Sequence, residues 1–183
     1  MRHRSIRSIL VFLALLSISD FFSCVAGFIF HEVNFRANPS IHDGKSLTQL
    51  ESAVRKTDMF ASIVSDEWKK KQTIAMYGKA FAEMSRGFLQ IHLIAEAMPG
   101  ASPCDFLFQV PLAVSSWTVK ENESKTRSSI VLDKEEYSIL QNCGSFFKGD
   151  GSLVLEFSSF EQCERFLNLL SAIEKRGIAG HNN

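Results

Sequence analysis

Residues 74–98 read IAMYGKAFAEMSRGFLQIHLIAEAM, and the spacing of the large apolar side chains in this stretch decides the fold that the sequence predicts. Apolar residues recur there at alternating intervals of three and four, which is the spacing of one face of an α-helix. The positions with this spacing are Ile74, Tyr77, Phe81, Met84, Phe88, Ile91, Ala95 and Met98. We therefore predict a long amphipathic helix that begins near Asp66 and ends before Pro99.

The residues beside this apolar stripe indicate whether it packs on its own domain or binds another chain. Small residues, among them Gly78 and Gly87, dilute the charged pairs that flank a committed coiled coil, so the stripe is expected to pack mainly on its own domain. Any part that the domain leaves uncovered would bind a partner helix, or a second copy of the chain as a homo-oligomer. The candidate interaction stripe consists of Ile74, Tyr77, Phe81, Met84, Phe88 and Ile91.

The segments before the stripe predict an extended arm, a loop and a first, shorter helix. Residues 28–45 begin with apolar side chains and end in turn-forming residues, which indicates an arm followed by a loop. Ser46 and Gln49 have the spacing of a capping box, in which each side chain bonds the backbone N–H of the other residue. Together with the long helix, this predicts helical structure over residues 46–98, with a break between the two helices.

After Gly100 the apolar spacing changes from the helical period to the period of two that is typical of strands. Short alternating runs separated by turn residues predict an antiparallel sheet of four to six strands over residues 105–157. A capped helix over residues 159–176 and a frayed tail over 178–183 complete the chain. The predicted fold is α+β, with residues 46–177 as a single domain in which the last helix packs on the sheet.

The end of the chain resembles the end of a known class of domains. The strand Leu153–Phe157, which runs into the capped helix 159–176, is similar to the last strand and helix of pleckstrin-homology-like domains. The resemblance includes no diagnostic motif, and the long helices predicted before the sheet are not part of that family's plan. We carry no lipid-binding or peptide-binding site over from it.

The first 27 residues have the order of a secretory signal peptide. Three arginines precede an apolar run over Ile9–Leu16, and small residues then lead to Gly27, after which we expect cleavage. The apolar run is about half the length that a ~30 Å bilayer core requires, so no stable membrane span should remain after cleavage. The mature chain would then be secreted and work outside the cell.

The charge of the mature chain argues against nucleic acid as a partner, and its cysteine content is compatible with an oxidising compartment. Removal of residues 1–27 takes away three arginines and Asp20, which leaves 17 basic and 19 acidic side chains and no electrostatic reason to bind nucleic acid. Cys24 leaves with the leader, and the three other cysteines allow one disulfide and one free thiol. A glycosylation sequon that begins at Asn122 also fits a secreted chain. The candidate disulfide partners are Cys104, Cys143 and Cys163.

No local motif points to catalysis, a metal or a cofactor. His31 and Glu32 begin the pattern of a zinc-binding helix, but Phe35 stands where the second histidine is needed. We therefore expect a secreted, non-enzymatic protein-binding domain, similar in class to the exported effectors and surface proteins of parasites and symbionts. The 16 phenylalanines also suit a carrier of an apolar ligand. An enzyme with a site assembled only by folding is the third alternative.

Overall fold

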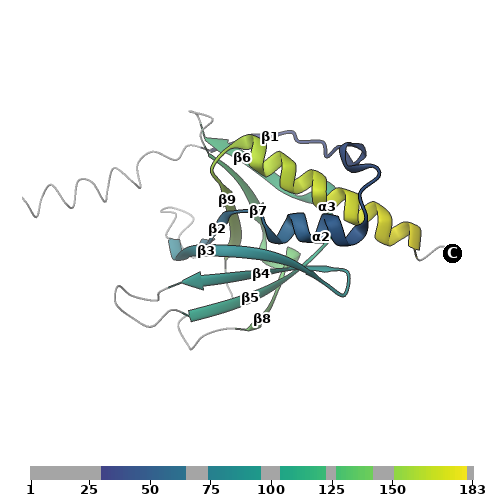
Figure 1. The fold of residues 1–183 in the computed structure, drawn as a ribbon. Coiled ribbons are helices and arrows are strands. Elements are labelled where there is room, and N and C mark those ends of the chain that lie inside the picture. The colour runs from purple at the N-terminus through teal and green to yellow at the C-terminus, as the bar shows by residue number, and fades with distance from the viewer. Residues whose placement is uncertain (1–29, 65–73, 96–103, 123–126, 142–150, 181–183) are drawn as a thin grey trace, which may run out of the picture. The chain divides into compact units, whose positions relative to one another are not determined.

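The computed structural model describes residues 30–64, 74–95, 104–122, 127–141 and 151–180. The internal contacts divide the chain after Phe30, and the fold belongs to the unit that begins at His31. The described residues form nine strands, two α-helices and three short 3₁₀ helices (Figure 1). In chain order these are β1 (Phe30–Val33), η1 (Pro39–His42), α2 (Leu47–Arg55), β2 (Met59–Val64), β3 (Ile74–Ser85), β4 (Phe88–Ala95), β5 (Cys104–Pro111), η3 (Val114–Ser116), β6 (Thr118–Asn122), β7 (Ser128–Leu132), η4 (Lys134–Glu136), β8 (Ser138–Gln141), β9 (Ser152–Phe157) and α3 (Phe160–Gly180).

One nine-stranded sheet has the order β1-β6-β7-β9-β2-β3-β4-β5-β8, and every pair with a described register is antiparallel. Only residues 133–137 join β7 to β8, although the two strands stand six places apart in this order. Six strand spacings in a flat sheet would measure about 29 Å, whereas the connecting chain reaches about 22 Å at most. The sheet is therefore strongly bent on itself. Tyr137 Oη donates to the Gly151 carbonyl at 2.8 Å and ties this connection to the start of β9.

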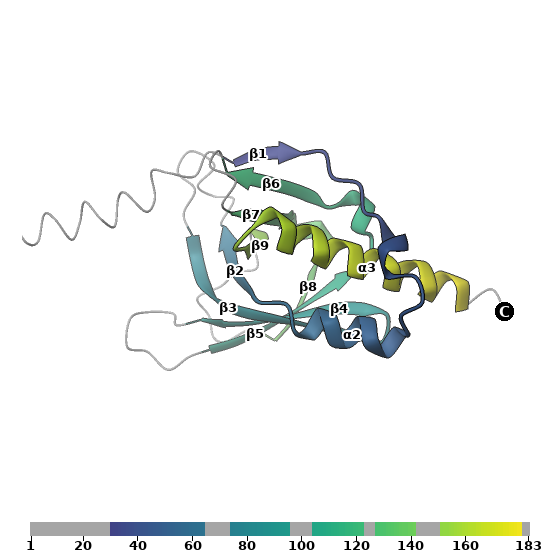
Figure 2. The same cartoon turned by 45° about the horizontal axis from the view of Figure 1, so that its top comes forward.

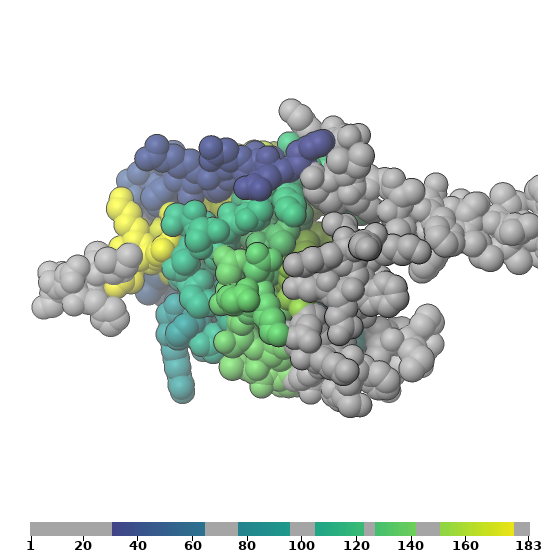
Figure 3. Space-filling model, turned by 180° about the vertical axis from the view of Figure 1, so that it is seen from behind, coloured from purple at the N-terminus to yellow at the C-terminus, as the bar shows by residue number. Residues whose placement is uncertain are grey.

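Both α-helices pack on the inner face of the bent sheet. α3 lies over β7 and β9, and α2 packs beside α3 and against β3 (Figure 2). The core between helices and sheet is made of alternate strand residues and one face of α3; its largest fully buried side chains include Phe106, Phe108, Phe157 and Phe166. Residues 30–46, here called the N-terminal arm, begin with β1, the neighbour of β6 at one edge of the sheet, and continue to η1, which packs against α3; the arm is purple to dark blue in Figure 3.

The predicted long helix is wrong. The segment from Ile74 to Ala95 is instead an antiparallel hairpin of β3 and β4, and Met59–Val64, also expected to be helical, forms β2. Arg86 and Gly87 join β3 to β4 with positive φ angles of 50° and 82°, as a two-residue hairpin turn in a twisted sheet requires. The predicted ends of the helix lie outside the described residues.

The burial pattern of β4 explains this outcome. Leu89, Ile91 and Leu93 are fully buried, whereas the residues between them face outward, which is a period of two. The helical spacing arose because large side chains from both faces of two strands were counted as one face of a helix. The neighbouring strands β2 and β5 supply the hydrogen-bond partners that stabilise the extended conformation.

The fold class differs accordingly from the predicted one. The described residues form a mostly antiparallel sheet of nine strands with one short helix and one C-terminal helix, rather than four to six strands with two amphipathic N-terminal helices. The capping box before α2 is confirmed, with Ser46 N donating to Gln49 Oε1 at 2.8 Å and Gln49 N donating to Ser46 Oγ at 3.2 Å. At the start of α3, Ser159 Oγ accepts from Gln162 N at 3.2 Å, and the helix continues to Gly180, beyond its predicted end.

Candidate functional site

Three neighbouring strands place aromatic side chains on the outer face of the sheet, away from the helices. Successive side chains of a strand point to opposite faces, so the residues beside the buried positions of β2, β3 and β4 point outward. We call this surface the outer aromatic face; it consists of Phe60, Tyr77, Phe81, His92 and Ile94. All except the histidine are between 38 % and 47 % exposed, which is high for side chains of this kind.

Stacking between strands holds the rings of this face in place. The rings of Phe60 and Tyr77 lie within 1° of parallel, with their centroids 5.5 Å apart. Phe81 is opposite His92 in the β3–β4 register, and their rings lie 8° from parallel with centroids 4.3 Å apart. Cross-strand pairs of this kind contribute about 0.2–1 kcal/mol each to a sheet. They also restrict the rotamers of the rings, so the surface is ordered before any partner binds.

Charged groups of both signs border the stacked rings. His92 lies between two carboxylates, with Nε2 3.5 Å from Glu83 Oε1 and Nδ1 3.8 Å from Asp105 Oδ1. Arg55 also reaches Glu83, at 3.5 Å. The Arg55–Glu83 pair is accessible to water and adds less than about 1 kcal/mol to stability.

Lys79 lies at the centre of the face, opposite Phe60 in β2 and Ile94 in β4, and its ammonium group is 3.4 Å from Asp58 Oδ1. The outer aromatic face therefore combines aromatic rings with an exposed cation.

A further carboxylate borders the face on the side of β9. Glu156 lies opposite Phe60 in the β2–β9 register. Its burial raises the pKa of the carboxyl group, while the charge of Arg127 acts in the opposite direction. This carboxyl group has therefore already lost part of its hydration, so a partner that covers it removes less water than from a fully exposed one.

The structure divides the predicted interaction stripe between two faces of the hairpin. Its exposed members are Tyr77, Phe81 and Phe88. Ile91 is fully buried in the core and Met84 packs half-buried against it, whereas the side chain of Ile74 lies outside the described residues. The six residues therefore do not form one surface.

Sequence reasoning missed three members of the outer aromatic face. His92 and Ile94 could have been found, because they follow the alternation of outward residues along β4. Phe60 belongs to β2, and only the pairing of β2 with β3 brings it against Tyr77. A single sequence holds no local signal for that pairing.

Two of the predicted modification sites are buried. Asn122 is 8 % exposed, and its Oδ1 accepts from Arg127 N at 2.9 Å across the β6–β7 turn. Cys163 is a buried free thiol in α3, and its burial raises the pKa to about 12. Cys143 lies outside the described residues, as does the side chain of Cys104. Glycosylation and a disulfide therefore stay predictions.

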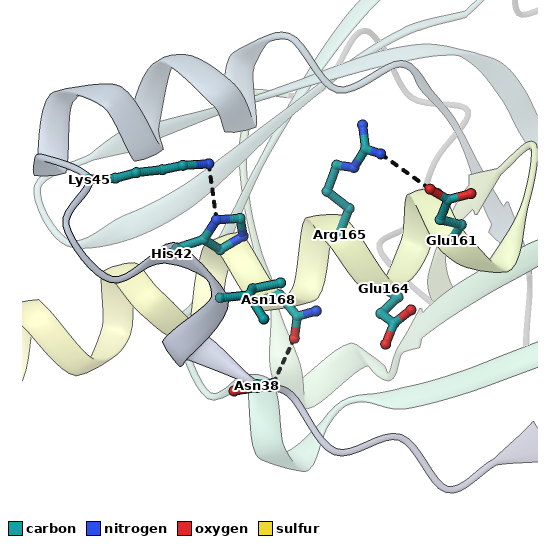
Figure 4. Close-up of a pocket in the computed structure, with 8 residues that line it drawn as sticks. Asn38, His42, Lys45, Glu161, Glu164, Arg165 and Asn168 are labelled. Atoms are coloured by element: carbon teal, nitrogen blue, oxygen red, sulfur yellow. Dashed lines mark hydrogen bonds and ion pairs between the residues drawn. The ribbon is translucent and has the colours of Figure 1, made fainter.

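An open cleft of about 450 Å³ lies between η1 and the first half of α3 (Figure 4). One wall is a face of α3 with Glu161, Glu164, Arg165 and Asn168. The other wall is the N-terminal arm with His42 and Lys45, which lie 3.2 Å apart between Nδ1 and Nζ. The Asn38 backbone N–H donates to Asn168 Oδ1 at 2.6 Å and joins the two walls.

Two kinds of site were also sought in the part of the chain that the structure describes. No three His, Cys, Asp or Glu residues among the described ones are grouped so that they could hold a metal ion. No helix within the same ranges is both long and apolar enough to cross a bilayer.

Comparison with known proteins found no relative of this chain. No protein-family model matches the chain, and no curated protein or solved structure is significantly similar to it. The resemblance to pleckstrin-homology-like domains therefore rests on the final strand and helix, β9 and α3. It brings no ligand site with it.

Proposed function

We propose that this chain is a secreted, non-enzymatic domain that binds another protein through the outer aromatic face. One observation carries the proposal: three aromatic rings held by stacking, those of Phe60, Tyr77 and Phe81, remain exposed on the side of the sheet that the core does not use. Exposed apolar surface is unfavourable in water, and contiguous patches of it are typical of interaction sites. Secretion rests on the signal-peptide pattern of the first 27 residues.

The rings suit binding because they are both large and ordered. Tyrosine and phenylalanine are enriched in the buried centres of interfaces, where they provide much contact area for few rotatable bonds. Stacking of Phe60 on Tyr77 and of Phe81 on His92 removes part of the entropy that ordering these side chains on binding would otherwise cost. A partner with apolar side chains for the rings and a carboxylate for the central Lys79 would complement this face.

A partner-independent selection tests the proposal. Peptides selected from a random display library against the wild-type chain should bind preferentially to its interaction surface. The double variant Tyr77→Ser, Phe81→Ser should lose these peptides by at least about tenfold, which corresponds to about 1.4 kcal/mol. Leu47→Ser is the matched control, because Leu47 is 45 % exposed on α2, away from the outer face.

The selection has an outcome that contradicts the proposal. If the selected peptides bind the double variant as tightly as the wild type, the outer aromatic face is not the contact surface. Equal loss in the Leu47→Ser control would lead to the same conclusion. Urea unfolding of each variant shows whether the fold is retained, which we expect because the substituted side chains lie outside the core.

A further inference from the structure

One row of opposite residues across the outer aromatic face alternates between charged and apolar side chains. In the described registers the row consists of Glu156 in β9, Phe60 in β2, Lys79 in β3, Ile94 in β4 and Asp105 in β5. Neighbouring strands are about 4.8 Å apart, so Glu156 and Asp105 each stand about 10 Å from Lys79. The central cation is therefore flanked on both sides by an apolar side chain and then by a carboxylate.

A second copy of the chain can match this row in the reverse order. A two-fold axis that runs along β2, midway between two sheets packed face to face, exchanges the strands on either side of β2. Lys79 of each copy then lies over Glu156 of the other, and Phe60 lies over Phe60. Sheets packed in this way are about 10 Å apart, a distance that a lysine and a glutamate side chain span together.

The next row of residues fits the same arrangement. It places Val154, Ser62 and Tyr77 opposite one another on β9, β2 and β3. The axis along β2 brings Tyr77, which is 47 % exposed, over the partly buried Val154 of the other copy. Packed sheets are usually turned by about 30° from parallel, which moves contacts one strand from the axis by only about 2 Å. Both exposed rings near the axis, Phe60 and Tyr77, would thus be covered by apolar groups.

The charges within one copy do not prevent this pairing. Asp58 lies 3.4 Å from Lys79, but the two side chains are 84 % and 72 % exposed, so their attraction is weak. Burial raises the pKa of Glu156 and the charge of Arg127 opposes this shift; a further cation above the carboxylate would also favour its charged form. The mature chain has 17 basic and 19 acidic side chains, so two copies repel each other little.

We propose that the outer aromatic face binds a second copy of this chain, with Lys79 of each copy on Glu156 of the other. The inference rests on the proposed function, because it names the partner of the same surface. Five strands of about six residues, from β7 to β4, measure roughly 24 by 20 Å, or about 480 Å² per copy. A standard interface covers about 800 Å² per partner, so the dimer should be weak, with a dissociation constant on the order of tens of micromolar.

Sedimentation of the purified chain, at concentrations from about tenfold below to tenfold above this constant, measures the dimer. Lys79→Glu and Glu156→Lys should each raise the dissociation constant at least tenfold, because either change opposes like charges at two contacts. An equimolar mixture of the two variants should dimerise as the wild type does, because one contact then joins the two native charges and the other joins the two reversed ones. Lys175→Glu is the matched control and should change nothing, since Lys175 is exposed on α3, on the helix side of the sheet.

The outcomes separate this inference from the proposed function. A chain that stays monomeric throughout the range would overturn the second copy as the partner; the proposed function would stand if the selected peptides still depend on Tyr77 and Phe81. A mixture that fails to restore the dimer, or an equal loss in the Lys175→Glu control, would also overturn the inference. Urea unfolding shows whether each variant is folded. If Glu156→Lys is not, Glu156→Gln replaces it, because it adds no charge beside Arg127, and should weaken the dimer in the same direction.

Discussion

Alanine in place of Gly78 tests the β3–β4 hairpin more directly than any other substitution. Gly78 stands in β3 opposite Ala95 of β4. A Cβ atom built on Gly78 would lie 2.9 Å from the Ile94 carbonyl carbon and 3.2 Å from Ala95 Cα, and it would come closer still to the Ile94 carbonyl oxygen. Ordinary contacts begin near 3.4 Å, so the two backbones would have to move apart.

Two other glycines provide comparisons for the expected change in the free energy of unfolding. Because the clash at Gly78 is with backbone, we expect Gly78→Ala to destabilise the fold by about 3 kcal/mol, the upper end of the overpacking range. Gly87 has open space but a φ of 82°, so Gly87→Ala should be unfavourable by about 1–2 kcal/mol through left-handed strain alone. Gly177 has open space within α3, and Gly177→Ala should stabilise the fold by about 0.5–1 kcal/mol.

Equilibrium urea unfolding of the three variants provides the measurement. Tryptophan fluorescence reports the transition, because Trp117, one of the two tryptophans, is 7 % exposed in the core. Linear extrapolation converts the midpoints into free energies of unfolding. If residues 74–98 were the predicted helix, Gly78→Ala and Gly87→Ala would stabilise the fold as Gly177→Ala does, because glycine is the poorest helix former apart from proline. A gain in stability for Gly78→Ala or Gly87→Ala would therefore refute the hairpin.

Other predictions concern buried groups. Tyr137→Phe removes the buried hydrogen bond to the Gly151 carbonyl and should lower the free energy of unfolding by about 1.5 kcal/mol, measured in urea. Ser128→Ala should raise it by about 1 kcal/mol, because Ser128 Oγ is buried without a hydrogen-bond partner; a loss of stability would indicate an unseen partner. The pKa of His42 is lowered from 6.5 in the folded state, so the contribution of the neutral ring to stability is fully present above pH 6.5 and is lost as the pH falls. His42→Gln should therefore flatten the dependence of the free energy of unfolding on pH below 6.5. An unchanged dependence would contradict this assignment. The Cys163 thiol, with its pKa raised to about 12 and its side chain buried, should react with iodoacetamide only after unfolding, as mass spectrometry would show.

Features that depend on residues close together in the chain were predictable from the sequence. The capping box of Ser46 and Gln49 before α2 and the start of α3 after Ser159 follow from side chains that bond backbone groups three residues away. Strand β5 was also predictable, because its alternate residues Phe106, Phe108 and Val110 are buried on one face, and a period of two is visible within a short stretch of sequence. These elements needed no knowledge of the rest of the fold.

The hairpin of β3 and β4 required the tertiary structure. β3 contains alanine, methionine, glutamate and lysine, all of which favour helix in isolation. The extended form prevails because β2 on one side and β5 on the other complete its hydrogen bonds, and because the sheet buries Leu89, Ile91 and Leu93. Intrinsic preferences of a few tenths of a kcal/mol per residue are small beside such burial, at about 1.5–3 kcal/mol per large side chain.

The outer aromatic face and the cleft beside α3 each depend on contacts between different segments of the chain. The sequence by itself determined the capped helices, the alternating strands and the signal-peptide pattern, because their signals span only a few residues. Phe60 meets Tyr77 only when β2 pairs with β3, and His42 faces α3 only when Asn38 bonds Asn168, 130 positions away. Those contacts were decided by the tertiary structure, since the burial and hydrogen bonding that stabilise them exist only after distant segments have come together.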